Sequence, residues 1–132
     1  QAASPWCGPT DFLKLNDVKA SQDYSNPRSA PSRLVGKPIK QAPEKCRQAN
    51  PITYVTKDDP PCFIVHGDRD FVVPLNQSEL LHAALKKAGV PSTLHVVKGA
   101  EHGFSKVTPA NNEIVEMVMD FFDRKFKNQA QP

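Results

Sequence analysis

The sequence lacks several patterns that mark well-known classes of protein. It has three cysteines, but they form no Cys-x-x-Cys pair and have no histidine at ligand spacing. We therefore expect no metal site and no cofactor. No stretch approaches the roughly 20 apolar residues of a membrane span, so we expect no span. The net charge of +3 is spread along the chain, without the basic run or aromatic platform of nucleic-acid binders, and we expect no nucleic-acid partner.

Regular structure is expected to be short in residues 18–61. Seven of the 13 prolines lie between Pro27 and Pro61, apolar residues are few there, and turn-forming residues dominate. Two brief helices are predicted, at about residues 29–35 and 43–49. Connections of this length in compact domains are usually functional or mobile.

A helix is predicted at about residues 77–88. Asn76 and Glu79 have the spacing of a capping box at its start, and Gly89 stands where a left-handed C-terminal cap is expected. The apolar residues of this stretch fall on one helical face; they are Leu81, Ala84, Leu85 and Ala88.

Short apolar and β-branched runs at residues 62–66 and 93–97 flank this helix and predict two strands. A strand, a helix and a strand within about forty residues form a βαβ unit, in which the two strands are parallel. Both strands then end at the same edge of the sheet. Ligand sites of open parallel sheets lie beyond this edge.

Asp70 and His102 follow the two predicted strands and are the candidate catalytic residues. Neighbouring strands are about 4.8 Å apart, so the loops bring the two side chains within reach of each other. A carboxylate bonded to one imidazole nitrogen leaves the other nitrogen free to take a proton from a nucleophile, which is half of a hydrolytic triad. Gly67, Gly99 and Gly103 permit the sharp turns such loops need. Contacts between aspartate and histidine also occur as purely structural pairs, so the residues alone leave both interpretations open.

Two motifs in these loops resemble a known family. His-Gly-x-x-Asp-x-x-Val-Pro at residues 66–74 and Gly-x-x-His-Gly-Phe at residues 99–104 are similar to the C-terminal half of an α/β-hydrolase. The similarity is to the bacterial esterase and lipase group that includes feruloyl-esterase-like enzymes, and it covers most of the chain. It implies an α/β fold with a partial sheet of about three parallel strands and flanking helices. It also implies that Asp70 is the triad acid and His102 the general base.

The resemblance implies roles for the first half of the chain as well. Residues 1–12 would end a strand whose loop reaches the active-site edge, so that Trp6 and Phe12 line the substrate pocket; ordinary turn and core packing is the alternative. Residues 18–61 would form a lid-like insertion, with a connecting segment as the alternative. Residues 1–132 would then be the C-terminal part of one hydrolase domain.

The pattern of a nucleophile is missing from the sequence. No serine lies in a Gly-x-Ser-x-Gly context, and the HGGG-type oxyanion loop is absent. We therefore expect an N-terminal half of the same enzyme to supply the serine and the oxyanion hole, with a small-molecule ester as substrate. Cys7 is set aside as a nucleophile because it lacks the corresponding Gly-x-Cys-x-Gly setting. Asp68 is a rival to Asp70 that the Asp-x-x-Val-Pro pattern disfavours, and His66 is expected to be structural.

The leading hypothesis is thus a carboxylic ester hydrolase of the serine type. One alternative is a serine peptidase of the prolyl-oligopeptidase type, because the C-terminal half of those enzymes is similar. The other is a non-catalytic fragment that acts as a scaffold or binding module, because a partial sheet exposes an open edge.

A last helix is predicted to follow Thr108 as N-cap, with Pro109 at its first position and a frayed tail after residue 127. It is expected to cover one face of the sheet with an apolar stripe; the stripe consists of Ile114, Val115, Val118, Phe121, Phe122 and Phe126.

Overall fold

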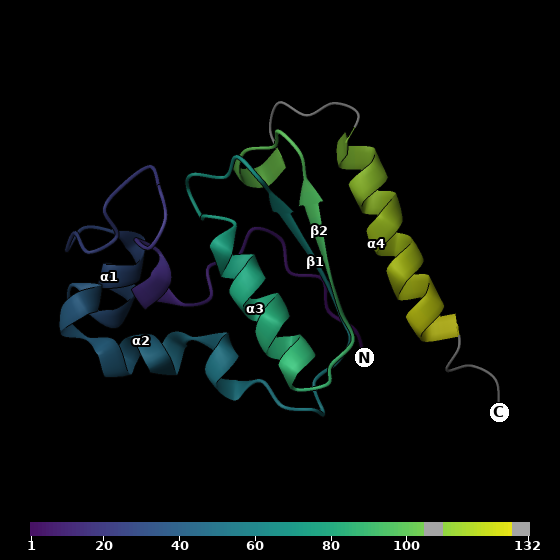
Figure 1. The fold of residues 1–132 in the computed structure, drawn as a ribbon, viewed down its shortest axis with the longest axis horizontal. Helices are drawn as coiled ribbons and strands as arrows, with labels where there is room; N and C mark the ends of the chain where they lie inside the picture. The colour runs from purple at the N-terminus through teal and green to yellow at the C-terminus, as the bar shows by residue number, and fades with distance from the viewer. Residues whose placement is uncertain (105–109, 128–132) are drawn as a thin grey trace.

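Two parallel strands, β1 (Cys62–Gly67) and β2 (Ser92–Val97), form the sheet around which the other elements pack. The computed structural model describes residues 1–104 and 110–127. The strands pair in register from Cys62 opposite Ser92 to Gly67 opposite Val97, and helix α3 (Asn76–Lys87) connects them. Both strands end at the same edge (Figure 1). The predicted βαβ unit is confirmed.

The two faces of β1 are covered by different helices. Ile64 is 1% exposed and packs with Leu85 of α3 on one face. Val65 is fully buried and packs with Ile114 of α4 (Ala110–Lys127) on the other. Successive side chains of a strand point to opposite faces, which explains this division. Figure 1 shows α3 and α4 on either side of the two strands.

The predicted third strand is present only as two isolated parallel bridges between residues 3–6 and β1. Pro5 is the physical reason, because it has no N–H to donate at the point where the ladder needs one. The carbonyl of Phe63 accepts a 2.8 Å hydrogen bond from the Ser4 hydroxyl instead. The sheet of about three strands predicted from the resemblance is therefore two strands flanked by a segment that a proline interrupts.

Helix α3 begins and ends within one residue of the predicted range 77–88. Its C-terminal prediction is confirmed, since Gly89 adopts a left-handed φ of 81° and closes the last turn. The predicted capping box is wrong, because no side chain caps the start of the helix. The Asn76 side chain instead donates a 3.0 Å hydrogen bond to the carbonyl of Lys14, in a distant part of the chain.

Residues 12–54, here called the helical segment, fold into short helices with a hydrophobic cluster of their own. Both predicted helices are confirmed, and three 3₁₀ turns accompany them. The elements are η1 (Phe12–Lys14), α1 (Ala30–Val35), η2 (Ile39–Gln41), α2 (Pro43–Ala49) and η3 (Pro51–Tyr54). The buried members of the cluster are Phe12, Leu15, Tyr24, Val35, Ile39, Ala42 and Cys46.

Helix α4 confirms the predicted last helix over Ala110–Lys127. The predicted cap at Thr108 and Pro109, and the tail after residue 127, lie outside the described residues. The predicted stripe is only partly core: Val115 and Phe126 are 45% and 50% exposed. Among the helices that the structure describes, none is long and apolar enough to span a bilayer.

Candidate active site

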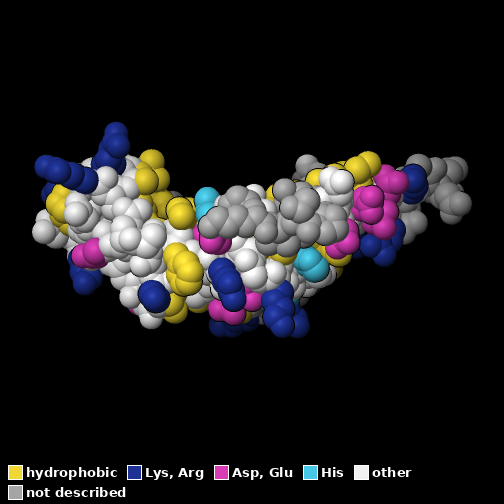
Figure 2. Space-filling model, turned by 90° about the horizontal axis from the view of Figure 1, so that it is seen from above, with side chains coloured by type: hydrophobic (Ala, Val, Ile, Leu, Met, Phe, Trp, Pro, Cys, Tyr) yellow, Lys and Arg dark blue, Asp and Glu magenta, His cyan; other side chains and the backbone are white. Residues whose placement is uncertain are grey.

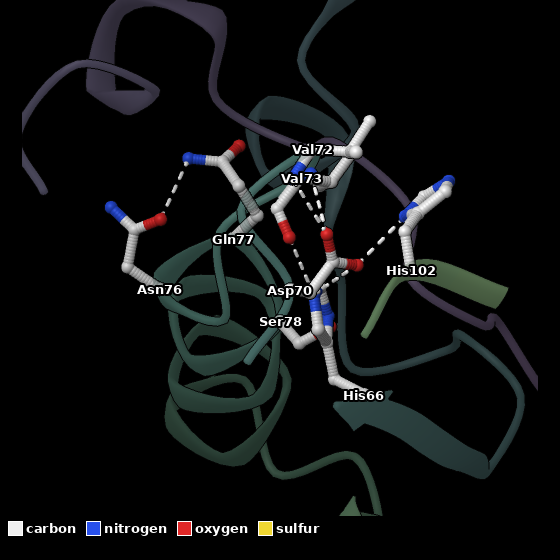
Figure 3. Close-up of polar contacts among 8 residues, drawn as sticks. All are labelled: His66, Asp70, Val72, Val73, Asn76, Gln77, Ser78 and His102. Carbon is white, nitrogen blue, oxygen red and sulfur yellow. Dashed lines mark hydrogen bonds and ion pairs between the residues drawn. The ribbon is translucent and has the colours of Figure 1, made fainter. Parts of the chain in front are cut away.

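The Asp70 carboxylate lies buried just beyond the end of β1 and is held by three hydrogen bonds (Figure 3). Its Oδ1 accepts from the backbone N–H groups of Val72 at 2.9 Å and Val73 at 2.8 Å. Its Oδ2 accepts from Nδ1 of His102 at 2.7 Å. The structure thus brings together the two residues that the sequence analysis selected, and the backbone fixes the carboxylate from the side opposite the imidazole.

The His102 ring is positioned to exchange protons with a substrate or nucleophile. It belongs to η4 (His102–Phe104), which follows β2, and its side chain is 42% exposed although its partner carboxylate is fully buried. Because an ionised carboxylate only accepts hydrogen bonds, Nδ1 carries the ring proton and Nε2 presents a lone pair. A general base needs this arrangement.

Backbone contacts lock the loops that carry these two side chains. The N–H of Arg69 donates to the carbonyl of Ala100 at 3.0 Å, and the Asp68 carboxylate accepts from the N–H of Gly99 at 2.6 Å. A Cβ at Gly67 would lie 2.3 Å from the Ala100 oxygen, so only glycine permits this approach. Asp68, the rival candidate acid, therefore braces the loop rather than contacting the imidazole.

His66 is fully buried beneath the carboxylate, and both of its ring nitrogens are engaged. Nε2 lies 2.7 Å from the carbonyl of Val73, to which it donates, and 3.4 Å from Oδ2 of Asp70. Nδ1 lies 2.6 Å from the Ser78 hydroxyl, from which it accepts. Burial lowers the pKa of His66, although hydrogen bonding to Val73 and the charge of Asp70 oppose this effect. His66 is therefore neutral near neutral pH and supports the acid loop, which confirms the structural role predicted for it.

Cys7 lies in the same buried cluster, which sequence spacing does not reveal. Its sulfur and ligand atoms of His66 and Asp70 all lie within 4.8 Å of one another, so these three residues are the described group that could hold a metal ion. Burial raises the pKa of the Cys7 thiol, and backbone hydrogen bonds from Gly103 and Gly67 only partly oppose this. A raised pKa keeps the thiol protonated near neutral pH, a state poorly suited to nucleophilic attack.

A cavity of about 610 Å³ opens beside the His102 ring. Trp6 is 40% exposed, and its ring meets that of Phe104 edge-on, with centroids 5.6 Å apart. Cys7 and Phe104 are the non-glycine residues with positive φ among those described, at 48° and 59°, and both line the cavity. Strained backbone of this kind gathers at functional sites. The lining residues are Trp6, Cys7, Gly8, Pro9, Val73, His102, Gly103, Phe104 and Val115.

Phe12 lies elsewhere, which corrects its predicted place in the pocket. Its ring is 7% exposed and packs in the cluster of the helical segment with Leu15, Val35 and Cys46. The family resemblance implied a pocket position for Phe12, with core packing as the alternative, and the structure shows the core packing. The chain turns away at Thr10 and Asp11, and η1 carries Phe12 into a separate core.

The described residues place no serine hydroxyl in a hydrogen bond with the His102 ring. Figure 2, which views the protein from the side where both strands end, shows hydrophobic side chains at the surface among histidine and acidic groups. The His102 side chain is 42% exposed at this edge, so its ring is accessible to a further segment or to a ligand.

Comparisons with known proteins find several esterases among the similar proteins, alongside a peptidase and polyketide synthases. The family model described as BD-FAE matches residues 1–85. Esterase LipQ of Mycobacterium tuberculosis is 31% identical over 92% of this chain and 28% of its own length. A truncated form of a carbohydrate esterase from gut microbiota is 36% identical, with a TM-score of 0.68 over 78% of this chain and 35% of that one.

A bifunctional GH43-CE protein of Bacteroides eggerthii is 28% identical, with a TM-score of 0.77 over 94% of this chain and 16% of that one. The 132 residues thus span 28% of the length of LipQ and a similarly small part of the solved structures.

Proposed function

The chain belongs to the BD-FAE family of α/β-hydrolases, and from this premise we propose that it supplies the acid and the base of a serine-type carboxylic ester hydrolase. The observation that carries the proposal is the 2.7 Å contact between Asp70 and His102 at the carboxyl ends of the strands. The cavity beside the exposed imidazole and the esterase relatives further support it.

In the proposed reaction, a serine from a segment outside these 132 residues attacks the ester carbonyl. Nε2 of His102 takes the serine proton, and the Asp70 carboxylate stabilises the imidazolium that forms. His102 then returns the proton to the leaving alcohol, and a water molecule hydrolyses the acyl-enzyme in the same way. Backbone donors of the serine-bearing segment would bind the oxyanion. No metal or cofactor takes part in this scheme.

Trp6 is the proposed substrate contact in this chain. Its indole is half-exposed at the cavity and leans against Phe104, and its Nε1 donates a 2.9 Å hydrogen bond to the Ser4 hydroxyl. Aromatic surface held in this way favours the apolar part of a small-molecule ester.

Residues 18–61 are the proposed lid-like insertion. The N–H of Ser21 donates to the carbonyl of Phe71 at 2.6 Å, and the Lys19 ammonium lies 5.8 Å from the centre of the Phe71 ring. Phe71 follows Asp70 directly, so the insertion contacts the loop that carries the acid. A segment attached there is suited to cover the active-site edge.

Labelling with a fluorophosphonate probe, followed by intact-mass spectrometry, tests the proposal. The expected result is that the serine-bearing polypeptide gains one phosphonyl group when these 132 residues are present, and that His102→Ala abolishes this gain. Equally fast labelling of the His102→Ala protein would overturn the role of His102. Absence of labelling with the N-terminal half present would leave the scaffold interpretation.

Comparison of two substrates separates the esterase from the peptidase alternative. An aryl ester and an aminoacyl amide with the same acyl group are offered to the complete enzyme, and kcat/KM is measured for each. We expect the ester to be cleaved and the amide not to be turned over measurably, because an esterase site does not position a leaving amine. Efficient turnover of the amide would support the prolyl-oligopeptidase-type peptidase instead.

A further inference from the structure

The first turn of α3 uses its polar side chains to bind other parts of the chain. Asn76 donates to the carbonyl of Lys14, and Ser78 contacts His66 beneath the acid. Gln77, between them, is fully buried. Figure 3 shows Asn76 and Gln77 on one side of the turn, with Ser78 and His66 on the side of Asp70. This one helical turn therefore contacts His66, which supports the Asp70 loop, and also contacts the first part of the chain.

Gln77 holds residues 10 and 11 by both its side chain and its backbone. Its Oε1 accepts from the N–H of Thr10 at 2.9 Å and from the N–H of Asp11 at 2.8 Å. Its backbone carbonyl accepts from the Thr10 hydroxyl at 2.8 Å. Thr10 is 4% exposed, so two of these contacts are shielded from water. Loss of the Oε1 acceptor would leave buried N–H groups without a partner.

The contact between Gln77 and Thr10 affects the cavity because the residues just before Thr10 line it. Cys7, Gly8 and Pro9 line the cavity on the wall that Trp6 also forms. At one end of this stretch the N–H of Cys7 donates to the carbonyl of Val65 at 3.0 Å. At the other end Gln77 holds Thr10. A wall fixed at both ends retains the strained φ of Cys7, which persists only where the surroundings enforce it.

We propose that Gln77 is a positioning residue that fixes the cavity wall of residues 7–9 relative to His102. The inference rests on the proposed ester hydrolase function, and it assigns Gln77 to the substrate-binding step. The Asp70 to His102 contact does not involve Gln77. Removal of the Oε1 acceptor is therefore expected to impair substrate binding more than the chemical step.

The test compares three substitutions in the complete enzyme. Gln77→Met keeps the length and volume of the side chain but removes the acceptor, whereas Gln77→Glu retains an acceptor oxygen. Gln48→Met, at an exposed position of α2, is the matched control. Two quantities are measured: amide hydrogen exchange at Thr10 and Asp11, and kcat and KM for an aryl ester.

Gln77→Met is expected to accelerate exchange at Thr10 and Asp11 by about tenfold and to raise KM by about tenfold, while kcat changes less than about threefold. Gln77→Glu keeps the acceptor and should restore slow exchange at Thr10 and Asp11, although it loses the Nε2 donor to Asn76, and Gln48→Met should change neither exchange nor KM. Unchanged exchange in Gln77→Met overturns the inference, as does a loss confined to kcat. A parent enzyme that hydrolyses no ester overturns the proposed function alone, because the exchange measurement still tests whether Gln77 fixes the wall.

Discussion

The βαβ unit of residues 62–104 and the helical segment of residues 12–54 are held together by different interactions. In the βαβ unit, the loops around the site are fixed by backbone hydrogen bonds and by buried polar side chains such as His66 and Asp70. The helical segment relies on a cluster of hydrophobic side chains between short helices. Hydrogen bonds are directional, whereas hydrophobic packing is not. Hydrogen bonds are therefore better suited to fix the atoms of a catalytic pair in place.

The two regions meet on the acid side of the site. Ser21 of the insertion donates to Phe71, next to Asp70, and Gln77 accepts from the backbone just before η1. The helical segment therefore contacts the loop and the helix that follow the acid, and changes within its core can alter access to the site without moving the catalytic pair.

The largest effect is predicted for His102→Ala in the complete enzyme. The variant should lose about 10⁴-fold or more in kcat for an aryl ester, because the general base is gone. The free energy of unfolding should fall by about 1–3 kcal/mol, because Oδ2 of the fully buried Asp70 carboxylate loses the donor Nδ1. Initial rates and urea unfolding measure the two quantities.

His95→Ala is the matched control, because His95 lies on β2 and is partly buried against Phe63, away from the cavity. It should retain near-parental kcat. Retention of ester hydrolysis by His102→Ala would mean that the βαβ unit does not carry the general base.

A second prediction concerns the helical segment. Phe12→Ala should lower the free energy of unfolding by about 3–4 kcal/mol, because it empties a core position that is 7% exposed. At temperatures where the variant stays folded, kcat should remain within about threefold of the parent value, since Phe12 is remote from the cavity. Leu34→Ala, at a position 71% exposed in the same segment, should cost less than about 0.5 kcal/mol. Equal losses of unfolding free energy in the two variants would mean that the hydrophobic cluster around Phe12 does not hold the helical segment together.

The sequence predicted the βαβ unit and the meeting of Asp70 with His102 because both depend on local patterns and on the geometry of parallel strands. Pro5 carried a signal that was available, since a proline inside a strand pattern argues against continuous pairing. The presence of Pro5 in this stretch therefore predicts an interrupted third strand.

The placements of Phe12 and Gln77 had no comparable local signal. Phe12 belongs to a cluster whose members come from several short helices, and the spacing of apolar residues does not tell which helices will pack together. Gln77 resembles an ordinary exposed residue in the first turn of a helix. Its burial and its bonds to Thr10 and Asp11 depend on a contact across more than sixty residues of sequence.

A third prediction adds one methyl group to the βαβ unit. Gly67→Ala should lower the free energy of unfolding by about 2 kcal/mol, because the new Cβ would lie 2.3 Å from the Ala100 oxygen. Relief of this clash should also move the loop of Asp70 away from the loop of His102 and reduce kcat for an aryl ester. Gly8→Ala is the control for stability, since a Cβ there meets nothing within 4 Å. A stable and fully active Gly67→Ala protein would show that the loops tolerate displacement and that their contacts do not set the geometry of the pair.

The smallest effect is predicted for the pH dependence that His66 imposes on the βαβ unit. Burial holds the pKa of folded His66 below its ordinary value of 6.5, so the unfolded chain binds more protons than the folded chain once the pH falls below that value. This part of the stability is present above about pH 6.5 and is lost progressively as the pH falls toward the folded pKa.

Substitution by glutamine should remove that dependence while keeping a side chain that can donate to Val73. Urea midpoints measured between about pH 7.5 and pH 5 should therefore fall less steeply for His66→Gln than for the parent. The pKa of His82 is lowered as well, by burial and by Lys86, and its contribution has the same sign in both proteins, so it cancels in the comparison. Parallel slopes would mean that His66 takes up its proton without loss of structure. The neutral hydrogen bonds to Ser78 and Val73 would then not be what supports the acid loop.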